Sequence, residues 1–425
     1  MKRLLLTLLA VATVVCAGAQ SLEECRALAR DHYPEIAQYD LINQTEQYNI
    51  SNAARAWIPQ VSVSAQATYQ SATPTYPEAF SAILTANGIE MAGIRNDQYK
   101  VAVDVSQNIW DGGLSKANKA IATAEAEEQR RRVDVSLYDL QSRVDNLYFG
   151  ILLLDERMAQ TETLISVLDS NLARMRAYYN NGVAMQADVD AIEAELLTAK
   201  QTRGQIESSR ASYRRMLEVF IGQPLSDATL QRPAMPTIES RTSARPELMM
   251  FDAQESRLEA QRNAINSSVM PRFSAFAQGY YGYPGMDMFK SMMSPTWSLN
   301  AIIGVRMSWN IGAFYTKKNN LQKIDVAQRQ VAVQRDVFLF NSEMQSVQYD
   351  GEIARLRSAV EDDDRIVELR QNVRRAAESQ LDNGVIDATD LLRKITDETA
   401  AMLQRSTHEI ELLQATYGLK TVLNQ

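Results

Sequence analysis

Few side chains in this 425-residue chain are of a type and spacing that could perform chemistry. The only two histidines, His32 and His408, lie far apart in the sequence, and no residues cluster with metal-ligand spacing. No Gly-x-Ser-x-Gly, Walker or dinucleotide-binding fingerprint is present. The sequence therefore predicts a protein that is not an enzyme and that uses no cofactor or resident metal.

Four methionines crowd one short segment: Met286, Met288, Met292 and Met293. Thioether sulfurs can bind Cu(I), so a protein that exports copper could use such a group. Methionines in loops are more often plain apolar filler. We favour the filler interpretation and keep copper as the alternative.

The run Glu361-Asp362-Asp363-Asp364 places four acids in a row within a predicted helix. Consecutive residues point around a helix, so no more than two of the four can share a face. If that face lined a pore, the acids would favour cations and repel anions. On a solvated outer face they would instead lie near Arg357 and Arg365. Both interpretations are open, and Asp362, Asp363 and Asp364 are candidate gate or selectivity residues.

The N-terminus has the pattern of a secretory signal. Two basic residues precede an apolar stretch from Leu4 to Val15, and small residues follow up to Ala19. This pattern predicts a signal peptide over residues 1–19, with cleavage before Gln20. We therefore expect the mature protein to be exported.

The two cysteines bear on processing and on redox chemistry. Lipidation of Cys16 is an alternative to cleavage after Ala19, but Val15 is bulkier than lipoprotein cleavage usually accepts. Cleavage after Ala19 leaves Cys25 as the only cysteine, so the sequence predicts no internal disulfide.

Charge and hydropathy narrow the class of protein to which this chain can belong. The net charge is −8 and no large basic block appears, so nucleic acid is not an expected partner. No stretch of 18 or more apolar residues follows the signal, so we expect no helical membrane anchor. The exported chain is then free outside the inner membrane, or it enters an outer membrane through β-strands.

The sequence repeats itself at an interval of about 200 residues. Four landmarks recur in the same order, at Pro34 and Pro246, Pro59 and Pro271, Trp110 and Trp309, and Asn181 and Asn383. Two halves of similar build must therefore make one molecule. We place the first structural repeat at residues 20–224, a linker at 225–245 and the second repeat at 246–425.

Long helices follow the second strand segment of each repeat. Apolar residues from Leu137 to Tyr179 are spaced alternately three and four apart, which is typical of a coiled coil of about six heptads. With a start near Ser115, this helix would be about 100 Å long. The Asn-Gly turn after it predicts an antiparallel hairpin with a second helix. The second repeat predicts the same pair over about 315–381 and 389–423.

Each repeat also contains two strand-like segments that flank a loop, at residues 71–97 and 282–295. Val61, Val63, Val101 and Val103 alternate with small polar residues. One apolar and one polar face suit a wall between lipid and water. The smallest outer-membrane barrels have about eight strands, so four strands require oligomerisation.

This arrangement resembles the TolC family of outer-membrane efflux channels over essentially the whole mature chain. The residues Trp110-Asp-Gly-Gly113 resemble the family's aromatic-Asp-Gly-Gly element. Asn181-Gly182-Val183, with Asp188 downstream, resembles the family's hairpin tip, and Asn383-Gly384-Val385 repeats it. Each motif alone is weak, but the doubled occurrence in register is specific.

The resemblance implies a mainly α fold with a membrane β part. It implies an internally duplicated chain whose long antiparallel helices form a trimeric α-barrel, joined to a trimeric 12-stranded β-barrel with four strands per chain. A homotrimer would sit in outer-membrane lipid of a Gram-negative cell and extend into the periplasm. Its partners would be a periplasmic adaptor, or membrane fusion, protein and an inner-membrane pump of the RND or ABC type.

The resemblance also implies the functional residues. The helix tips, formed by Asn181, Gly182, Val183, Asn383, Gly384 and Val385, would dock the adaptor. Ordinary helix stops are the alternative interpretation of these residues. Some family members close the channel with acids nine and twelve residues before the tip glycine. Here those places hold Arg375 and Asn372, so this chain departs from that pattern and a gate role for Arg375 is a hypothesis.

The predicted function is the exit channel of a tripartite efflux system that passively conducts small molecules, such as drugs or toxic compounds. Within the same class, the exit duct of a type I protein secretion system is an alternative. A non-conducting periplasmic coiled-coil tether is the alternative from a different class. The strands with one small polar face argue against the tether.

Overall fold

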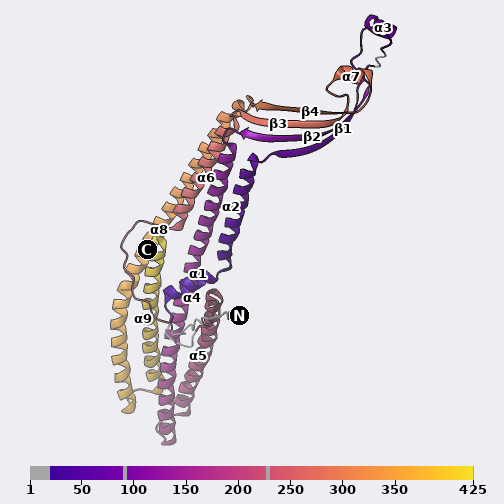
Figure 1. Cartoon of the computed structure of the whole chain (residues 1–425). Coiled ribbons are helices and arrows are strands. Elements are labelled where there is room, and N and C mark those ends of the chain that lie inside the picture. The colour runs from indigo at the N-terminus through magenta and orange to yellow at the C-terminus, as the bar shows by residue number, and fades with distance from the viewer. Residues whose placement is uncertain (1–19, 90–92, 226–229, 425) are drawn as a thin grey trace, which may run out of the picture. The chain divides into compact units, whose positions relative to one another are not determined.

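The computed structural model describes residues 20–89, 93–225 and 230–424. The predicted signal peptide and Cys16 lie outside the described residues. The described chain is mainly helical, with one four-stranded antiparallel sheet. Figure 1 shows the order of the elements along the chain.

The first repeat begins with α1 (Leu22–His32), a short 3-10 helix (Pro34–Ala37) and α2 (Gln38–Ala54). A second 3-10 helix (Arg55–Trp57) leads into β1 (Gln60–Tyr69), which is followed by α3 (Glu78–Ala86) and β2 (Asp97–Trp110). The long helix α4 (Leu114–Asn180) and α5 (Gln186–Ile221) complete it. The predicted start of α4 at Ser115 and its end at Tyr179 each differ from the structure by one residue.

From α2 onward, apart from the second 3-10 helix, the second repeat has the same order of elements. It consists of α6 (Pro246–Ser268), β3 (Arg272–Tyr283), α7 (Met288–Met293), β4 (Ser298–Ser308), α8 (Ala313–Asp382) and α9 (Ala388–Leu423). The internal duplication of the fold is thereby confirmed. The short helices α3 and α7 fall in segments predicted as loops, because six to nine residues are too few to show a helical period.

The sheet joins the two repeats. Its strand order is β1-β2-β3-β4, with all neighbours antiparallel. The pair Val63↔Val103 lies within the first repeat, and Val103↔Gly279 links β2 to β3 across the repeats. Helices α3 and α7 lie beyond one end of the strands, while α2 and α6 lead into the other end (Figure 1).

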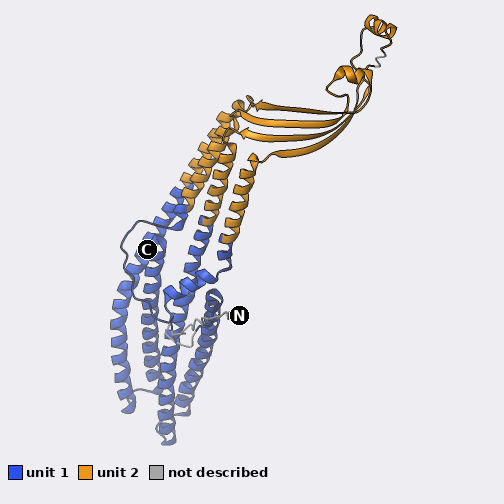
Figure 2. Cartoon of the chain, viewed as in Figure 1, with its two compact units in different colours: residues 1–39, 131–249, 334–425 blue, residues 40–130, 250–333 orange. Residues whose placement is uncertain are grey.

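The chain forms two compact units that do not coincide with the sequence repeats. One unit comprises residues 1–39, 131–249 and 334–425, and the other comprises 40–130 and 250–333 (Figure 2). Each unit takes segments from both repeats. The boundaries 20–224, 225–245 and 246–425 describe sequence order, and as domain limits they stay a prediction.

The main core of the helical unit gathers around Tyr148 and Phe149 of α4, which are almost fully buried. Leu22 and Cys25 of α1, Leu217 of α5 and Leu413 of α9 pack into this cluster. The Tyr148 hydroxyl lies 2.9 Å from the carbonyl of Gln20 and 2.5 Å from that of Gln231. The start of the described chain and the linker are therefore both fixed against α4.

A buried aspartate organises the passage from β2 into α4. One carboxylate oxygen of Asp111 accepts the Gly113 N–H at 3.0 Å, and the other accepts the Ser115 N–H at 2.7 Å and the Ser115 hydroxyl. Burial opposes ionisation, but these hydrogen bonds outweigh it and lower the pKa of Asp111. A side chain at Gly112, with its φ of 71°, would meet Met270 Cβ at 2.5 Å. In the Asp-Gly-Gly element, Asp111 therefore caps the start of α4, and the backbone at Gly112 packs closely against Met270.

Candidate functional site: the helix tips, the acidic run and the sheet faces

The first helix hairpin ends in a Schellman turn. Gly182 has a φ of 74°, and its N–H donates to the Tyr179 carbonyl at 2.9 Å. The Val183 N–H donates to the Tyr178 carbonyl at 2.9 Å. Glycine suits this position because left-handed backbone costs other residues about 1–2 kcal/mol.

The second hairpin repeats this turn. Gly384 has a φ of 70° and donates to the Leu381 carbonyl at 3.0 Å, while Val385 donates to the Gln380 carbonyl at 2.8 Å. The side chains of Asn181 and Asn383 each donate to the carbonyl four residues earlier, at 2.9 and 2.7 Å. The repeated tip sequence is therefore a repeated structure, hydrogen bond by hydrogen bond.

Both tip valines point away from their own helices. Val183 is 75% exposed and Val385 is 70% exposed. A Schellman turn commonly buries the residue after the glycine against the preceding helix. An ordinary helix stop would show that contact. The exposure favours a surface that a partner covers, and adaptor docking at these six residues stays a prediction.

The two hairpins contact each other close behind the tips. Tyr178 of α4 donates a hydrogen bond to Asp382 of α8 at 3.1 Å, and Arg174 lies 3.3 Å from the same carboxylate. The hydrogen bond to Asp382 raises the pKa of the Tyr178 phenol. An apolar cluster that includes Leu172, Val189 and Ala388 lies beneath these contacts.

Two of the four consecutive acids face α9. Asp363 is buried, and its Oδ2 lies 2.6 Å from Nδ1 of His408. Asp364 forms an ion pair with Arg405. Asp362 is exposed and, within the described ranges, has no ion-pair partner. The contact with His408 could not be predicted from the sequence, because the helical period does not show the register between α8 and α9.

Arg375 is exposed on α8, while its neighbour Arg374 is paired. Arg374 bonds to Glu398 of α9 and lies 2.6 Å from Glu378. Burial disfavours the charge on Arg374, but the two carboxylates outweigh it and raise the pKa of the guanidinium. Arg374 is thus a link between α8 and α9 that sequence reasoning missed. A gate or selectivity role for Asp362, Asp363, Asp364 and Arg375 stays a prediction.

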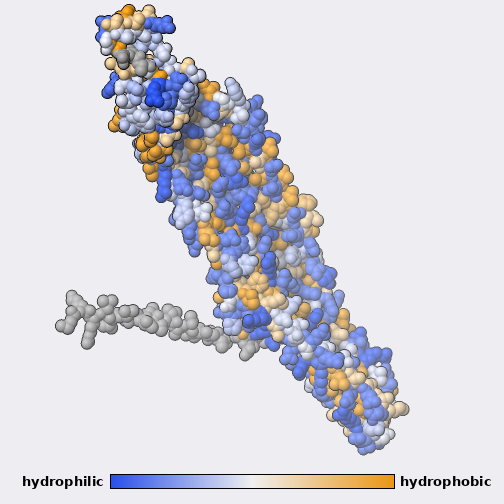
Figure 3. Space-filling view, turned by 90° about the vertical axis from the view of Figure 1, so that its right-hand side faces the viewer, coloured by the Kyte–Doolittle hydropathy of each residue, from blue (hydrophilic) through white to orange (hydrophobic). Residues whose placement is uncertain are grey.

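The sheet has one apolar face. Cross-strand neighbours such as Val63 and Val103 share it, and Ile303 of β4, on the same face, is 83% exposed. Hydrophobic residues are interspersed with hydrophilic ones on the surface shown in Figure 3. A single chain does not bury so exposed an apolar face, so lipid or protein must cover it.

Aromatic rings mark both ends of this apolar face. Near the outer loops, Trp297 stacks on Tyr99 with ring centroids 6.0 Å apart and lies 5.3 Å from Tyr281. At the other end, Trp110 lies 6.0 Å from Phe273. An apolar band between two aromatic girdles is the pattern of strands that cross an outer membrane.

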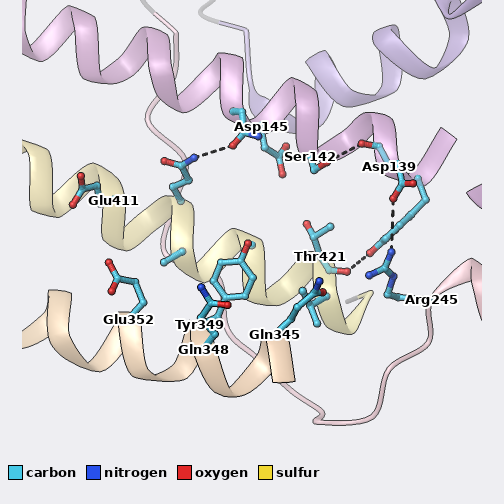
Figure 4. Close-up of a pocket in the computed structure, with 16 residues that line it drawn as sticks. Asp139, Ser142, Asp145, Arg245, Gln345, Gln348, Tyr349, Glu352, Glu411 and Thr421 are labelled. Atoms are coloured by element: carbon cyan, nitrogen blue, oxygen red, sulfur yellow. Dashed lines mark hydrogen bonds and ion pairs between the residues drawn. The ribbon is translucent and has the colours of Figure 1, made fainter. Parts of the chain in front are cut away.

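A cavity of about 600 Å³ lies between α4, α8 and α9 (Figure 4). Its carboxylates include Asp139, Asp145, Glu352 and Glu411. Asp145 is paired with Arg26 at 2.5 Å, and Glu352 with Arg355 at 2.6 Å. Burial raises the pKa of Asp145 despite this partner. The Asp145 pair joins α4 to α1, whereas the Glu352 pair lies within α8.

Within residues 20–89, 93–225 and 230–424, no group of three or more His, Cys, Asp and Glu side chains could hold a metal ion. Met292 packs with Ile94 and Tyr283, as apolar filler would, while Met286, Met288 and Met293 are exposed.

None of the helices that the structure describes is both long enough and apolar enough to cross a membrane.

Comparison with known proteins gives one family. Residues 26–223 match the model of the outer membrane efflux protein family. No curated protein sequence matches the chain. The outer membrane protein VceC of Vibrio cholerae has a similar structure, with 13% identity, a TM-score of 0.68 and 95% of each chain covered.

Two further solved structures show the same fold. The open-state MtrE outer membrane channel of Neisseria gonorrhoeae is 14% identical, with a TM-score of 0.65, and the match covers 95% of this chain and 88% of that one. The CmeC outer membrane channel of Campylobacter jejuni is 11% identical, with a TM-score of 0.65 and coverage of 95% and 86%. The fold expected from the sequence is thereby confirmed.

Proposed function

We propose, from the match of residues 26–223 to the model of the outer membrane efflux protein family, that this chain is the exit channel of a tripartite efflux system. Through it, an inner-membrane pump and a periplasmic adaptor expel small toxic molecules. The family match and the fold shared with VceC support the coarser part of this statement, an outer-membrane channel rather than an enzyme. Cargo, partners and assembly are the proposal.

The two-faced sheet supports a barrel that is closed by several copies. Four strands are too few for a barrel, since the smallest have about eight. The outer edges of the sheet, β1 and β4, are unpaired within the described chain. Pairing of β4 with β1 of the next copy would close both edges. In the proposed homotrimer, 12 strands form the membrane barrel and the long helices form a periplasmic α-barrel.

The doubled tip carries the docking part of the proposal. Two turns of the same structure, each with an exposed valine, give six equivalent apolar contacts in a trimer. An adaptor that assembles around such an end can use one type of contact at every position. Exposed backbone at Gly182 and Gly384 allows close approach.

The acidic run supports a weaker part of the proposal. Asp362, exposed on α8, would be repeated three times around a trimer. If it faces the lumen, such a ring favours cations at the periplasmic end. Arg375, about 13 residues along the same helix, would place a ring of opposite charge nearer the tip.

A photo-crosslinking amino acid at Val385 tests the docking assignment in living cells. Irradiation should attach an adaptor protein, which mass spectrometry identifies together with its pump. A proton-driven pump supports efflux of small molecules, whereas an ATP-driven transporter points to protein or macrolide-type export. The matched control places the same amino acid at Leu197, which is 57% exposed in the middle of α5. If trimers assemble in the outer membrane and Val385 captures no adaptor, the docking assignment fails.

A further inference from the structure

The second face of the sheet carries charge of the opposite sign to the rest of the molecule. The whole chain has a net charge of −8. On this face the register places three cationic side chains, Lys100, Arg272 and Arg306, and one carboxylate, Asp104. We call it the polar face. Strand β1 contributes only uncharged residues to it, such as Ser62, Ser64 and Gln66.

The single carboxylate is tied to one of the cations through an amide. Gln278 donates to Asp104 through Nε2, and its Oε1 accepts from Lys100 Nζ at 3.1 Å. The ammonium group of Lys100 has three donors, and Gln278 uses one of them. Lys100 also lies over the ring of Tyr280, 4.6 Å from the centroid. Its position is therefore set by two neighbours while N–H groups remain for a ligand.

A hollow of about 280 Å³ opens beside Lys100. Its lining includes the amides of Gln66, Gln70 and Gln98, the hydroxyl of Thr68 and the ring of Tyr280. Lys100 is the only charged side chain in this lining. A cation, several hydrogen-bond donors and an aromatic ring around one hollow suit an organic anion with a flat body.

A second pairing of a cation with a ring lies further along the same face. Arg306 stacks over the ring of Phe276, 4.7 Å from the centroid. The Phe276 ring in turn occupies the space beside its cross-strand partner Gly304, where a Cβ would meet it at 2.9 Å. Among the residues that the structure describes, no carboxylate lies within ion-pair distance of Arg306. Its guanidinium therefore stays available for an anion.

The two pairs are spaced along β3. Lys100 pairs with Gly282, and Arg306 pairs with Ser274. Eight residues of strand separate these positions, which is about 26 Å at the usual rise. A path with two weak binding stations, rather than one tight site, allows a solute to enter and to leave.

We propose that the polar face is a two-station path for organic anions with aromatic bodies, held by Lys100 with Tyr280 and by Arg306 with Phe276. This rests on the proposed function, because the polar face lines the lumen only when the apolar face meets lipid in a closed barrel. It names the chemical class of cargo that the strand part of the channel favours.

The test measures binding of pyranine, a pyrene dye with three sulfonates, to the purified full-length protein in detergent by fluorescence anisotropy. The double variant Lys100→Gln, Arg306→Gln should weaken binding at least about fivefold at low salt. Asp104→Asn should tighten it. Lys290→Gln, a matched loss of charge on α7 outside the polar face, should leave it unchanged.

Phe276→Leu separates position from charge. Arg306 keeps its charge in this variant but loses the ring that holds it, so binding should weaken about two- to threefold. Equal binding by wild type and the double variant, or no binding by wild type, would overturn the proposal. The same variants are expressed in cells that lack the gene for this protein. There we check whether they form trimers in the outer-membrane fraction and whether they restore drug resistance. Failure there, with pyranine binding intact, counts against the exit-channel function instead.

Discussion

The ring of Tyr213 on α5 fills the space that a side chain at Gly150 of α4 would need. A Cβ built at Gly150 would lie 2.6 Å from Tyr213 Cε1. The other hairpin has the same contact with the roles exchanged, because Tyr349 of α8 lies over Gly418 of α9, again at 2.6 Å. Each hairpin is thus locked in register by one tyrosine against one glycine.

These contacts predict the effect of adding a single methyl group. Gly150→Ala gains helix propensity of about 1 kcal/mol, but overpacking against the ring costs typically 1–3 kcal/mol. We expect a net loss of stability of about 1 kcal/mol, read as a lower thermal midpoint by circular dichroism. Gly204→Ala on α5 is the control, since nothing lies within 4 Å of a Cβ there, and it should be neutral or stabilising. Loss of the same size at Gly204 would contradict the register lock.

A second prediction concerns the tips. Gly384→Trp meets no heavy atom within 4 Å at its Cβ, so the only folding cost is the positive φ, about 1–2 kcal/mol. Folding and trimer formation should persist while adaptor capture in a pull-down is lost. Gly88→Trp is a matched control, because it also has a positive φ and open space around the Cβ, but it lies in the β1–β2 loop. Undiminished capture by the Gly384→Trp protein would argue against docking there.

The acidic run should show unequal effects at adjacent positions. Asp363→Asn disturbs a buried contact with His408, and loss of a buried charged hydrogen bond costs about 1–3 kcal/mol. Asp362→Asn, on the exposed side, should change stability by less than about 0.5 kcal/mol. If Asp362 faces the lumen, Asp362→Asn should also lower cation selectivity in planar bilayers. Thermal midpoints measure the effect on stability, and reversal potentials measure the effect on selectivity.

Asp111 predicts a dependence of stability on pH. Its folded pKa is lowered, so its contribution is present above the pKa of the unfolded chain, about 4, and is lost as pH falls through the folded value. Asp111→Asn should therefore be less stable than wild type at pH 7. The difference should shrink progressively below about pH 4. If the free energies of unfolding of the two proteins changed in parallel with pH, Asp111 would not be the source of the pH dependence.

The thiol of Cys25 should be inert in the folded protein. It is fully buried, and burial, followed by Glu24 and Glu23, raises its pKa to about 12. Thiolate is the reactive form, so alkylation by iodoacetamide at pH 8 should be slow until denaturant is added. Mass spectrometry of the peptide that contains Cys25 measures the rate. Rapid labelling of the native protein would mean that α1 leaves the core readily.

The sequence predicted the order of elements well, because heptad spacing, strand alternation and Asn-Gly turns are local signals. The bounds of α8 and α9 differ from the prediction by at most two residues at each end. Helix α1 was not predicted, although Ser21 and Glu24 form a capping box that the sequence displays as Ser-x-x-Glu. That signal was available in the residues themselves.

Contacts between distant residues could not be predicted in this way. His408 and Asp363 are 45 residues apart, and their meeting depends on the exact offset between two long helices. The same holds for Arg374 with Glu398. Periodicity identifies the face of a helix that is buried, but it does not fix how far one helix is shifted along the next.

The pairing of β2 with β3 has a consequence for a chain that is divided into its two repeats. Since the sheet closes only when strands from both repeats meet, a protein cut between α5 and α6 would consist of two fragments that each expose a bare strand edge. Neither fragment should accumulate alone, yet both made together in one cell could reassemble.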